Sequence, residues 1–192
     1  MESLRVEIEG SARHAHVTPA DLQTLFGPGA VLHNKKELSQ PGQYVTEERI
    51  RVEGPRGGID RISILGPERA ATQVEVSLTD ARALGVTPPV RESGQLAGSA
   101  PARLVGPAGT LELPEGVIIA KRHIHVSDTD AVRYGLSDKE IVSVRVEGDR
   151  ALTFGEVVIR VSPEFRTSMH IDIDEFNAAG LSGTATGLVV KP

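Results

Sequence analysis

A short pattern that occurs twice constrains the fold of this chain more than any other feature of its sequence. Arg-His-Ala-His-Val-Thr at residues 13–18 returns 109 residues later as Arg-His-Ile-His-Val-Ser at residues 122–127, and an aspartate follows each copy at the same distance (Asp21 and Asp130). Four of the six histidines belong to these two copies. Repetition over such a distance predicts a chain built from two similar halves by internal duplication.

Each copy holds two histidines separated by one residue, His14 and His16 in the first and His123 and His125 in the second. On an extended strand such a pair points both imidazoles to one face, because strand side chains alternate with a period of two. Neutral imidazole is a common protein donor to zinc. Chance or a surface feature would explain one pair, but explains two pairs in register less well. The pattern therefore favours a two-metal site.

The repeat also contains a third candidate ligand in each half. Val-Glu-Val-Ser-Leu-Thr-Asp at residues 74–80 aligns, at an offset of 95, with Met-His-Ile-Asp-Ile-Asp-Glu at residues 169–175, so that Glu75 falls opposite His170. Three protein ligands leave a zinc ion with an open position, which is typical of a catalytic site. The predicted ligands are His14, His16 and Glu75 for one metal, and His123, His125 and His170 for the other.

Composition narrows the class of protein. The chain has 192 residues, a net charge of −5 and only 3% aromatic residues, so we expect no nucleic-acid partner, which would need a basic stripe and stacking rings. It has no apolar run of membrane-spanning length and begins almost at once with a candidate strand, so we expect no membrane segment and no signal peptide. The absence of cysteine excludes a disulfide framework and a cysteine nucleophile. Together these features favour the cytosol.

Most of the chain has the pattern of short strands rich in valine and isoleucine, separated by glycine and proline. Short strands at this spacing predict a mainly β fold, a small barrel or a sandwich, and the duplication favours two small domains. The predicted strands are residues 6–9, 49–53, 61–65, 73–77, 111–113, 117–120, 141–147, 156–161 and 168–173.

Four short helices are predicted between the strands, again in pairs. Thr18 is expected to cap residues 19–25, Ser127 residues 128–134 and Thr79 residues 80–84, while Asp174 is expected to precede residues 175–179. The stretch from Pro88 to Pro114, rich in glycine, proline and serine, is expected to be the crossover between the halves.

Over nearly its whole length the chain resembles the phosphotransacylases of the PduL type, the phosphate propanoyltransferases. Several blocks carry the resemblance, and their order and spacing are specific. They are Ser-Ala-Arg-His-Ala-His at 11–16, Leu-Ser-Gln-Pro-Gly-Gln at 38–43, Leu-Gly-Pro-Glu-Arg at 65–69, Thr-Gln-Val-Glu-Val-Ser at 72–77, Pro-Val-Arg-Glu-Ser-Gly at 89–94, Gly-Val-Ile-Ile-Ala-Lys-Arg-His-Ile-His at 116–125 and Met-His-Ile-Asp-Ile-Asp-Glu-Phe-Asn-Ala-Ala at 169–179.

The resemblance implies a fold, a cofactor and a reaction. It implies two small β-barrels, residues 13–120 and 121–192, with residues 1–12 packing into the second barrel and the active site in the cleft between the two. It implies two zinc ions, or another divalent metal such as cobalt, held by the six ligands named above. The implied reaction moves an acetyl or propanoyl group between coenzyme A and inorganic phosphate, reversibly, in a homodimeric enzyme. Because the chain has no cysteine to form an acyl-enzyme, direct attack of metal-bound phosphate is the favoured route.

Further site residues follow from the resemblance, position by position. Arg69 matches the family's phosphate-contacting arginine, and Ser93, Arg160 and Asn177 match other polar residues of its substrate-binding region. A guanidinium suits two-pronged recognition of phosphate oxygens. For Arg69 the alternative is a surface charge after a Gly-Pro turn.

Many relatives carry an amphipathic N-terminal extension that directs them into a bacterial microcompartment. Here Met1–Leu4 is too short to form a helix of useful length, so we expect a protein that is free in the bacterial cytosol or enters a microcompartment by another route. This weakens the link to propanediol degradation and leaves acetate metabolism open.

Several alternatives stay open at the level of sequence. The same metals could activate water in a hydrolase of thioesters or phosphate esters, or the duplication could be only a structural device in a binding module. Arg13 and Arg122 could bind phosphates or pair with acidic residues of the repeat. Asp172 or Asp174 could orient a metal-bound imidazole or cap a helix, and a cap is the preferred role for Asp174.

Overall fold

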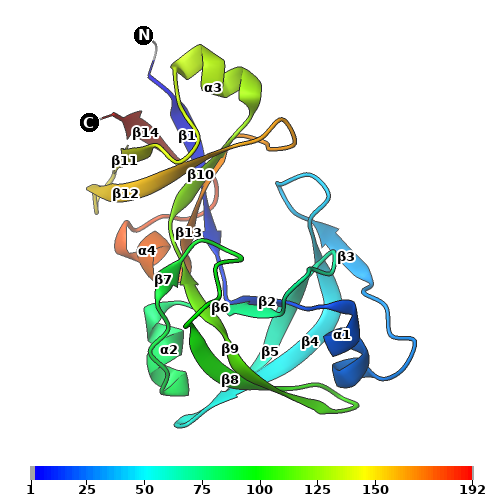
Figure 1. Ribbon diagram of the computed structural model, residues 1–192. Coiled ribbons are helices and arrows are strands. Elements are labelled where there is room, and N and C mark those ends of the chain that lie inside the picture. Colours follow the sequence, from blue (N-terminus) through cyan, green and yellow to red (C-terminus); the bar gives the residue numbers. More distant parts are fainter. Residues whose placement is uncertain (1–2, 192) are drawn as a thin grey trace. The chain divides into compact units, whose positions relative to one another are not determined.

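A computed structural model describes residues 3–191 and divides the chain into two compact units (Figure 1). Residues 12–120 form one unit, called here the first barrel, and the residues up to Ser11 together with those from Lys121 onward form the other, the second barrel. Both units consist mainly of strands, so the predicted β class is confirmed. Across residues 3–191 no helix has both the length and the apolar character needed to span a membrane.

The first barrel is a ring of six strands in which each strand pairs with two neighbours. Around the ring the order is β2, β5, β4, β8, β9, β6 and back to β2. Two short strands, β3 (Asn34–Glu37) and β7 (Val90–Arg91), pair onto β4 and β9 outside the ring. The ring strands are β2 (His14–His16), β4 (Tyr44–Gly54), β5 (Gly57–Gly66), β6 (Gln73–Glu75), β8 (Ala100–Val105) and β9 (Thr110–Ala120).

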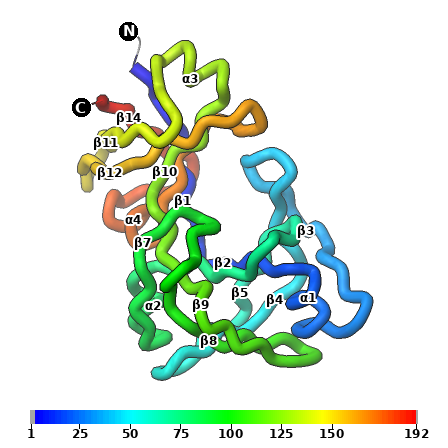
Figure 2. The backbone as a smooth tube through the Cα atoms, in the orientation of Figure 1, coloured from blue at the N-terminus to red at the C-terminus, as the bar shows by residue number. Residues whose placement is uncertain are grey.

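The second barrel is also a closed ring of six strands, in the order β1, β13, β10, β12, β11, β14. In Figure 2 the blue N-terminal strand can be followed into this ring of later strands, where it pairs with β13 and β14. The ring strands are β1 (Arg5–Ser11), β10 (His123–Val126), β11 (Ile141–Val146), β12 (Leu152–Val161), β13 (Ser168–Asp172) and β14 (Ala185–Val190).

The two rings have the same strand order and directions, but each is closed by the leading strand of the other repeat. In the sequence, β1 precedes the first His-x-His pair and β9 precedes the second. In the structure β9 pairs parallel with β6, and β1 takes the equivalent place beside β13. The registers agree as well, because Val117 opposite Val74 corresponds to Ile8 opposite Met169. The two repeats therefore exchange one strand reciprocally.

Each barrel encloses its own apolar core, formed by the inward side of its alternating strands. Ala15, Ile64 and Val74 are fully buried in the first barrel, and Ile124 and Met169 are fully buried in the second. The cores begin directly beneath the histidine strands, since Ala15 and Ile124 are the residues between the paired histidines. The same strands thus anchor the core on one face and present imidazoles on the other.

Four helices connect the strands, and two of them begin where the sequence predicts. Thr18 caps α1 (Pro19–Phe26) and Ser127 caps α3 (Asp128–Tyr134). For α2 (Leu78–Leu84) and α4 (Ile173–Ala178) the predicted caps were two residues late. The caps are Ser77 and Asp172, because each forms a reciprocal capping box with the acidic residue three positions on.

The predicted crossover from Pro88 to Pro114 was also wrong. It contains β7, all of β8 and the start of β9, and the two strands predicted at 111–113 and 117–120 are one strand. Ala100–Val105 alternates between buried and exposed positions as a barrel strand must, but its proline and small residues hide that pattern. The expectation for Met1–Leu4 falls partly on residues 1 and 2, which lie outside the described residues.

Candidate functional site

The first histidine site, defined as His14, His16 and Glu75, lies on two adjacent strands of the first barrel. In the antiparallel pair of β2 and β6, His14 stands opposite Glu75 and His16 stands opposite Gln73. Within residues 3–191, His14, His16 and Glu75 offer ligand atoms that all lie within 4.8 Å of one another. Two imidazoles and a carboxylate at this spacing are a donor set suited to zinc.

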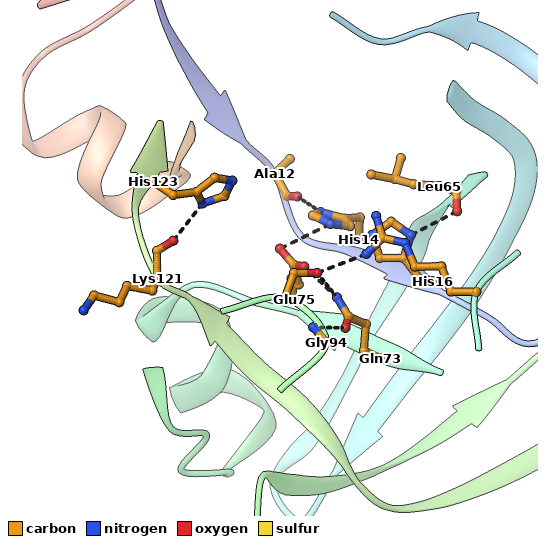
Figure 3. A network of polar contacts seen from close by, with 11 residues as sticks. Ala12, His14, His16, Leu65, Gln73, Glu75, Gly94, Lys121 and His123 are labelled. Carbon is orange, nitrogen blue, oxygen red and sulfur yellow. Dashed lines mark hydrogen bonds and ion pairs between the residues drawn. The ribbon is translucent and has the colours of Figure 1, made fainter. Parts of the chain in front are cut away.

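Hydrogen bonds to the backbone fix which imidazole nitrogen is available in this site. His14 Nδ1 lies 2.9 Å from the carbonyl oxygen of Ala12, and His16 Nδ1 lies 3.2 Å from that of Leu65 (Figure 3). A carbonyl can only accept, so both Nδ1 atoms must carry the proton. In the neutral rings Nε2 then keeps its lone pair, which is the form that binds a metal.

His14 and Glu75 approach each other through atoms that can bind a metal. His14 Nε2 lies 3.4 Å from Glu75 Oε2, and both side chains are largely buried. A ring nitrogen and a carboxylate oxygen that both bear lone pairs repel one another unless a proton or a cation sits with them. The pair therefore fits a site that holds a metal ion.

Burial strongly favours the neutral form of His16. Loss of solvation lowers the pKa of this imidazole to about 2, with further lowering by His14 and by the positive charge of Arg69. The side chain is 2% exposed. A histidine held neutral at physiological pH is ready to donate to a metal without first losing a proton.

A chain of polar contacts connects Arg69 to the carboxylate of Glu75. Arg69 Nη1 donates to Ser93 Oγ at 3.0 Å, and Gln73 Nε2 donates both to Ser93 Oγ and to Glu75 Oε1, each at 2.7 Å. The loop after β7 is tied in as well, because the Gly94 N–H donates to Gln73 Oε1 at 2.9 Å. The structure thus joins the predicted residues Arg69, Ser93 and Glu75 in one network.

The second histidine site, defined as His123, His125 and His170, has the equivalent position on β10 and β13. His123 stands opposite His170, and His125 stands opposite Ser168. The ring centroids of the three histidines lie 4.7 to 5.4 Å apart. His123 Nδ1 lies 2.9 Å from the carbonyl of Lys121, the same contact that His14 makes with Ala12. The duplication therefore gives the two barrels sets of donor residues at equivalent strand positions.

The two sites differ in how their third ligand is held. His170 Nε2 lies 3.0 Å from Ser168 Oγ, and His170 Nδ1 lies 4.0 Å from Glu9 Oε2 on the exchanged strand β1. His125 packs against the ring of Phe165 at 4.2 Å between centroids. The donors of this site are gathered less tightly than those of the first site, which alone among residues 3–191 has all its ligand atoms within 4.8 Å.

Two other predicted site residues belong to the second barrel. Arg160 stands in register with His125 on the neighbouring strand β12, and its guanidinium lies 5.9 Å from the centre of the Phe165 ring. Asn177 is exposed near the end of α4, the helix that follows His170. The structure thus brings Arg160 near the histidine strand and leaves Asn177 at the surface.

The repeated arginines pair with acidic residues of the repeat. Arg13 lies 2.8 Å from Asp80, and Arg122 lies 2.8 Å from Glu175. Both partners are the third helical residues of the capping boxes of α2 and α4. These arginines therefore tie each histidine strand to the helix that follows the third ligand.

Sequence reasoning missed Gln73 and Ser168, which hold the third ligand in each barrel. Strand alternation could have found both, because a residue two positions before Glu75 or His170 lies on the same face of the strand. The polar character of these two residues on a histidine-bearing face was the available signal.

Comparison with known proteins gives consistent matches. A sequence model of the family described as phosphate propanoyltransferase matches residues 7–182. The phosphate propanoyltransferase of Enterococcus faecalis is 50% identical over 185 residues, covering 96% of this chain and 88% of the relative. That of Thermotoga maritima is 53% identical over 173 residues, covering 90% and 82%. That of Salmonella typhimurium is 51% identical over 171 residues, covering 88% and 81%.

Proposed function

The chain belongs to the phosphate propanoyltransferase family and is thus a phosphate acyltransferase, and we propose that it moves an acetyl or propanoyl group between coenzyme A and inorganic phosphate with the help of zinc. Membership of the family implies acyl-CoA and phosphate as substrates. The choice of acyl group, the metal and the residues that act are the parts that we propose.

The observation that carries the proposal is the first histidine site. Its two imidazoles have Nδ1 occupied by backbone carbonyls, and its three ligand atoms lie within 4.8 Å of one another. The donor set fits zinc, and the second histidine site would hold a second ion through His123, His125 and His170. Zinc bound there would neutralise the phosphate charge and polarise the thioester oxygen as a Lewis acid.

Arg69 is the residue that we assign to phosphate binding. Its side chain is partly buried, and its backbone N–H donates to the carbonyl of Val17 at 2.9 Å, which anchors the residue beside the histidine strand. The contact with Ser93 orients the guanidinium. A planar group with several N–H donors can grip two phosphate oxygens at once and fix the direction of attack.

The reaction then needs no covalent enzyme intermediate. A phosphate oxygen attacks the thioester carbonyl carbon, the carbon–sulfur bond breaks, and coenzyme A leaves as a thiolate that takes a proton from solvent. Negative charge develops on the thioester oxygen in the transition state and calls for electrostatic stabilisation. The chain has no cysteine to form a thioester with the acyl group, so direct transfer between the two substrates is the simplest route.

A coupled assay tests the proposal. CoA release is measured from acetyl-, propanoyl- and butanoyl-CoA, with phosphate present or omitted and with zinc added back to chelated protein. We expect release that requires phosphate, produces acyl phosphate in equal amount and falls with the longest acyl chain. Release that proceeds at the same rate without phosphate would instead identify a hydrolase that uses water.

A further inference from the structure

We propose that Gln73 is a positioning residue that holds both the metal ligand Glu75 and the phosphate-binding pair of Arg69 and Ser93. The inference rests on the proposed function, since it assigns Gln73 a role toward a metal site and a phosphate site. It goes beyond that function because Gln73 bears neither a metal-ligand atom of the usual kind nor a charge for phosphate.

The contacts of Gln73 leave little freedom to its amide group. The side chain is 2% exposed. Its nitrogen donates to Glu75 and to Ser93, and its oxygen accepts from the Gly94 N–H. An amide has two N–H donors and one carbonyl oxygen, so these three contacts engage both of its ends. The N–H of Gly94 can only donate, which settles which end of the amide is oxygen.

The first consequence concerns Glu75. Gln73 binds Oε1, while Oε2 is the oxygen nearest His14 Nε2. The carboxylate is thereby held by one oxygen and would keep the other free to hold a metal ion. A partner of this kind orients a ligand and keeps its charge, and loss of such partners typically costs about 10- to 100-fold in metal affinity or activity.

The second consequence concerns Ser93. Its oxygen accepts from both Arg69 and Gln73, which uses its two lone pairs. The hydroxyl proton must then point away from both donors, and Ser93 becomes a donor toward whatever lies on the remaining side. Gln73 therefore sets the direction of a hydroxyl that lies beside the phosphate-binding guanidinium.

The second barrel offers an internal comparison. Ser168 stands at the position equivalent to Gln73 and also contacts the third ligand of its site, His170. The serine side chain is shorter than that of glutamine, and Glu164 stands where the first barrel has Arg69. The task of holding the third ligand is thus common to both barrels, and the link to a phosphate-binding arginine belongs to the first barrel.

Gln73→Met tests the inference, because it keeps the length of the side chain and removes its donors and acceptor. Zinc affinity is measured by competition with a chelator, and steady-state kinetics give KM for phosphate and for acyl-CoA separately. We expect zinc binding at one of the two sites to weaken by about 10- to 100-fold. KM for phosphate should rise several-fold more than KM for acyl-CoA, a split that a general loss of packing would not produce.

Gln95→Met is the matched control. Gln95 is exposed and lies in the same loop as Ser93 and Gly94, so the same change of side chain should leave zinc affinity and both KM values as in the unchanged protein. Should Gln73→Met fail to fold, Gln73→Asn replaces it, since it keeps an uncharged amide. Its shorter side chain draws the amide away from Glu75 and Ser93, and we expect the same selective rise in KM for phosphate.

A double-mutant cycle completes the test. If Gln73 acts through Ser93, the losses in kcat/KM from Gln73→Met and Ser93→Ala should be far from additive in the double variant. A Gln73→Met protein with the zinc affinity and phosphate KM of the Gln95→Met control would overturn the inference. Failure of the unchanged protein to bind zinc or to transfer acyl groups would instead overturn the proposed function.

Discussion

The two barrels share a strand order, and their histidine sites differ at two equivalent positions. The first site has Gln73 and Glu75 where the second has Ser168 and His170. With zinc bound, the carboxylate would leave the first site with one positive charge less than the second, so the second ion would be the stronger Lewis acid. The repeated strands β2 and β10 thus give each site its pair of histidines. The strands β6 and β13, which carry the third ligand, set the charge of each site.

The loops that follow β5 and β12 differ in charge as well. Three residues after β5 the first barrel has Arg69, and at the equivalent position after β12 the second barrel has the exposed Glu164. Arg69 contacts Ser93, which Gln73 joins to Glu75 of the first histidine site. A carboxylate at the equivalent place would repel phosphate. The first barrel is therefore the one that we expect to bind the anion.

The largest expected effect comes from removing a histidine from each site. His14→Ala and His123→Ala should each lose close to one equivalent of zinc per chain and nearly all activity, because each removes one of three ligands. Metal analysis and the coupled assay measure both. His33→Ala, a change at an exposed histidine outside both sites, should retain the full metal content. Full occupancy in the double variant of His14 and His123 would refute the ligand assignment.

The next largest expected effect is a loss of turnover when the charge at Arg69 is removed, compared with the same change at the equivalent Glu164. Arg69→Ala should lower turnover about ten- to hundredfold, since losing a hydrogen bond to a charged group costs about 1.5–3 kcal/mol. Arg69→Lys should recover only part of this, because an ammonium lacks the two-pronged geometry. The loss should appear in both directions of the reaction. Glu164→Ala should leave turnover unchanged, and equal losses at the two positions would remove the asymmetry.

The smallest expected effect is on stability and concerns His16 in chelated, metal-free protein. Its folded pKa is about 2 and its unfolded value is near 6.5, so the unfolded chain binds the extra proton as the pH falls. The associated stability is complete above pH 6.5 and declines below it by up to about 1.4 kcal/mol per pH unit. Denaturant unfolding between pH 7 and 5 measures this decline. His16→Gln should flatten it, and an unchanged slope would contradict the burial of a neutral imidazole.

Local patterns were sufficient for the β class and for parts of the first site. The alternation of strand side chains placed His14 and His16 on one face. Thr18 and Ser127 were recognisable as the N-caps of α1 and α3. The caps of α2 and α4 were misplaced because several serine, threonine and aspartate residues compete there. Which one caps depends on the residue three positions later that closes the capping box.

Pairings between distant strands could not be read from the residues alone. β1 and the second half of β9 both lead into a His-x-His pair, and either could pair beside β6 or β13 on local grounds. The resemblance to a known family suggested the place of the N-terminal strand, which the local pattern did not. The strand β8 and the final strand β14 stayed hidden because glycine, proline and small residues dilute their alternation.

In this chain neither repeat completes its barrel with its own leading strand. A polypeptide with only one repeat could complete its barrel only as a domain-swapped dimer, in which each copy contributes its leading strand to the barrel of the other. In this chain the two repeats belong to one polypeptide, so dilution cannot separate them. β1 lies beside His170 at Glu9 and leads five residues later to His14, while β9 lies beside Glu75 at Ile118 and leads five residues later to His123. Fraying of either exchanged strand would therefore disturb residues of both histidine sites, so we expect metal loading and unfolding of the two sites to be cooperative.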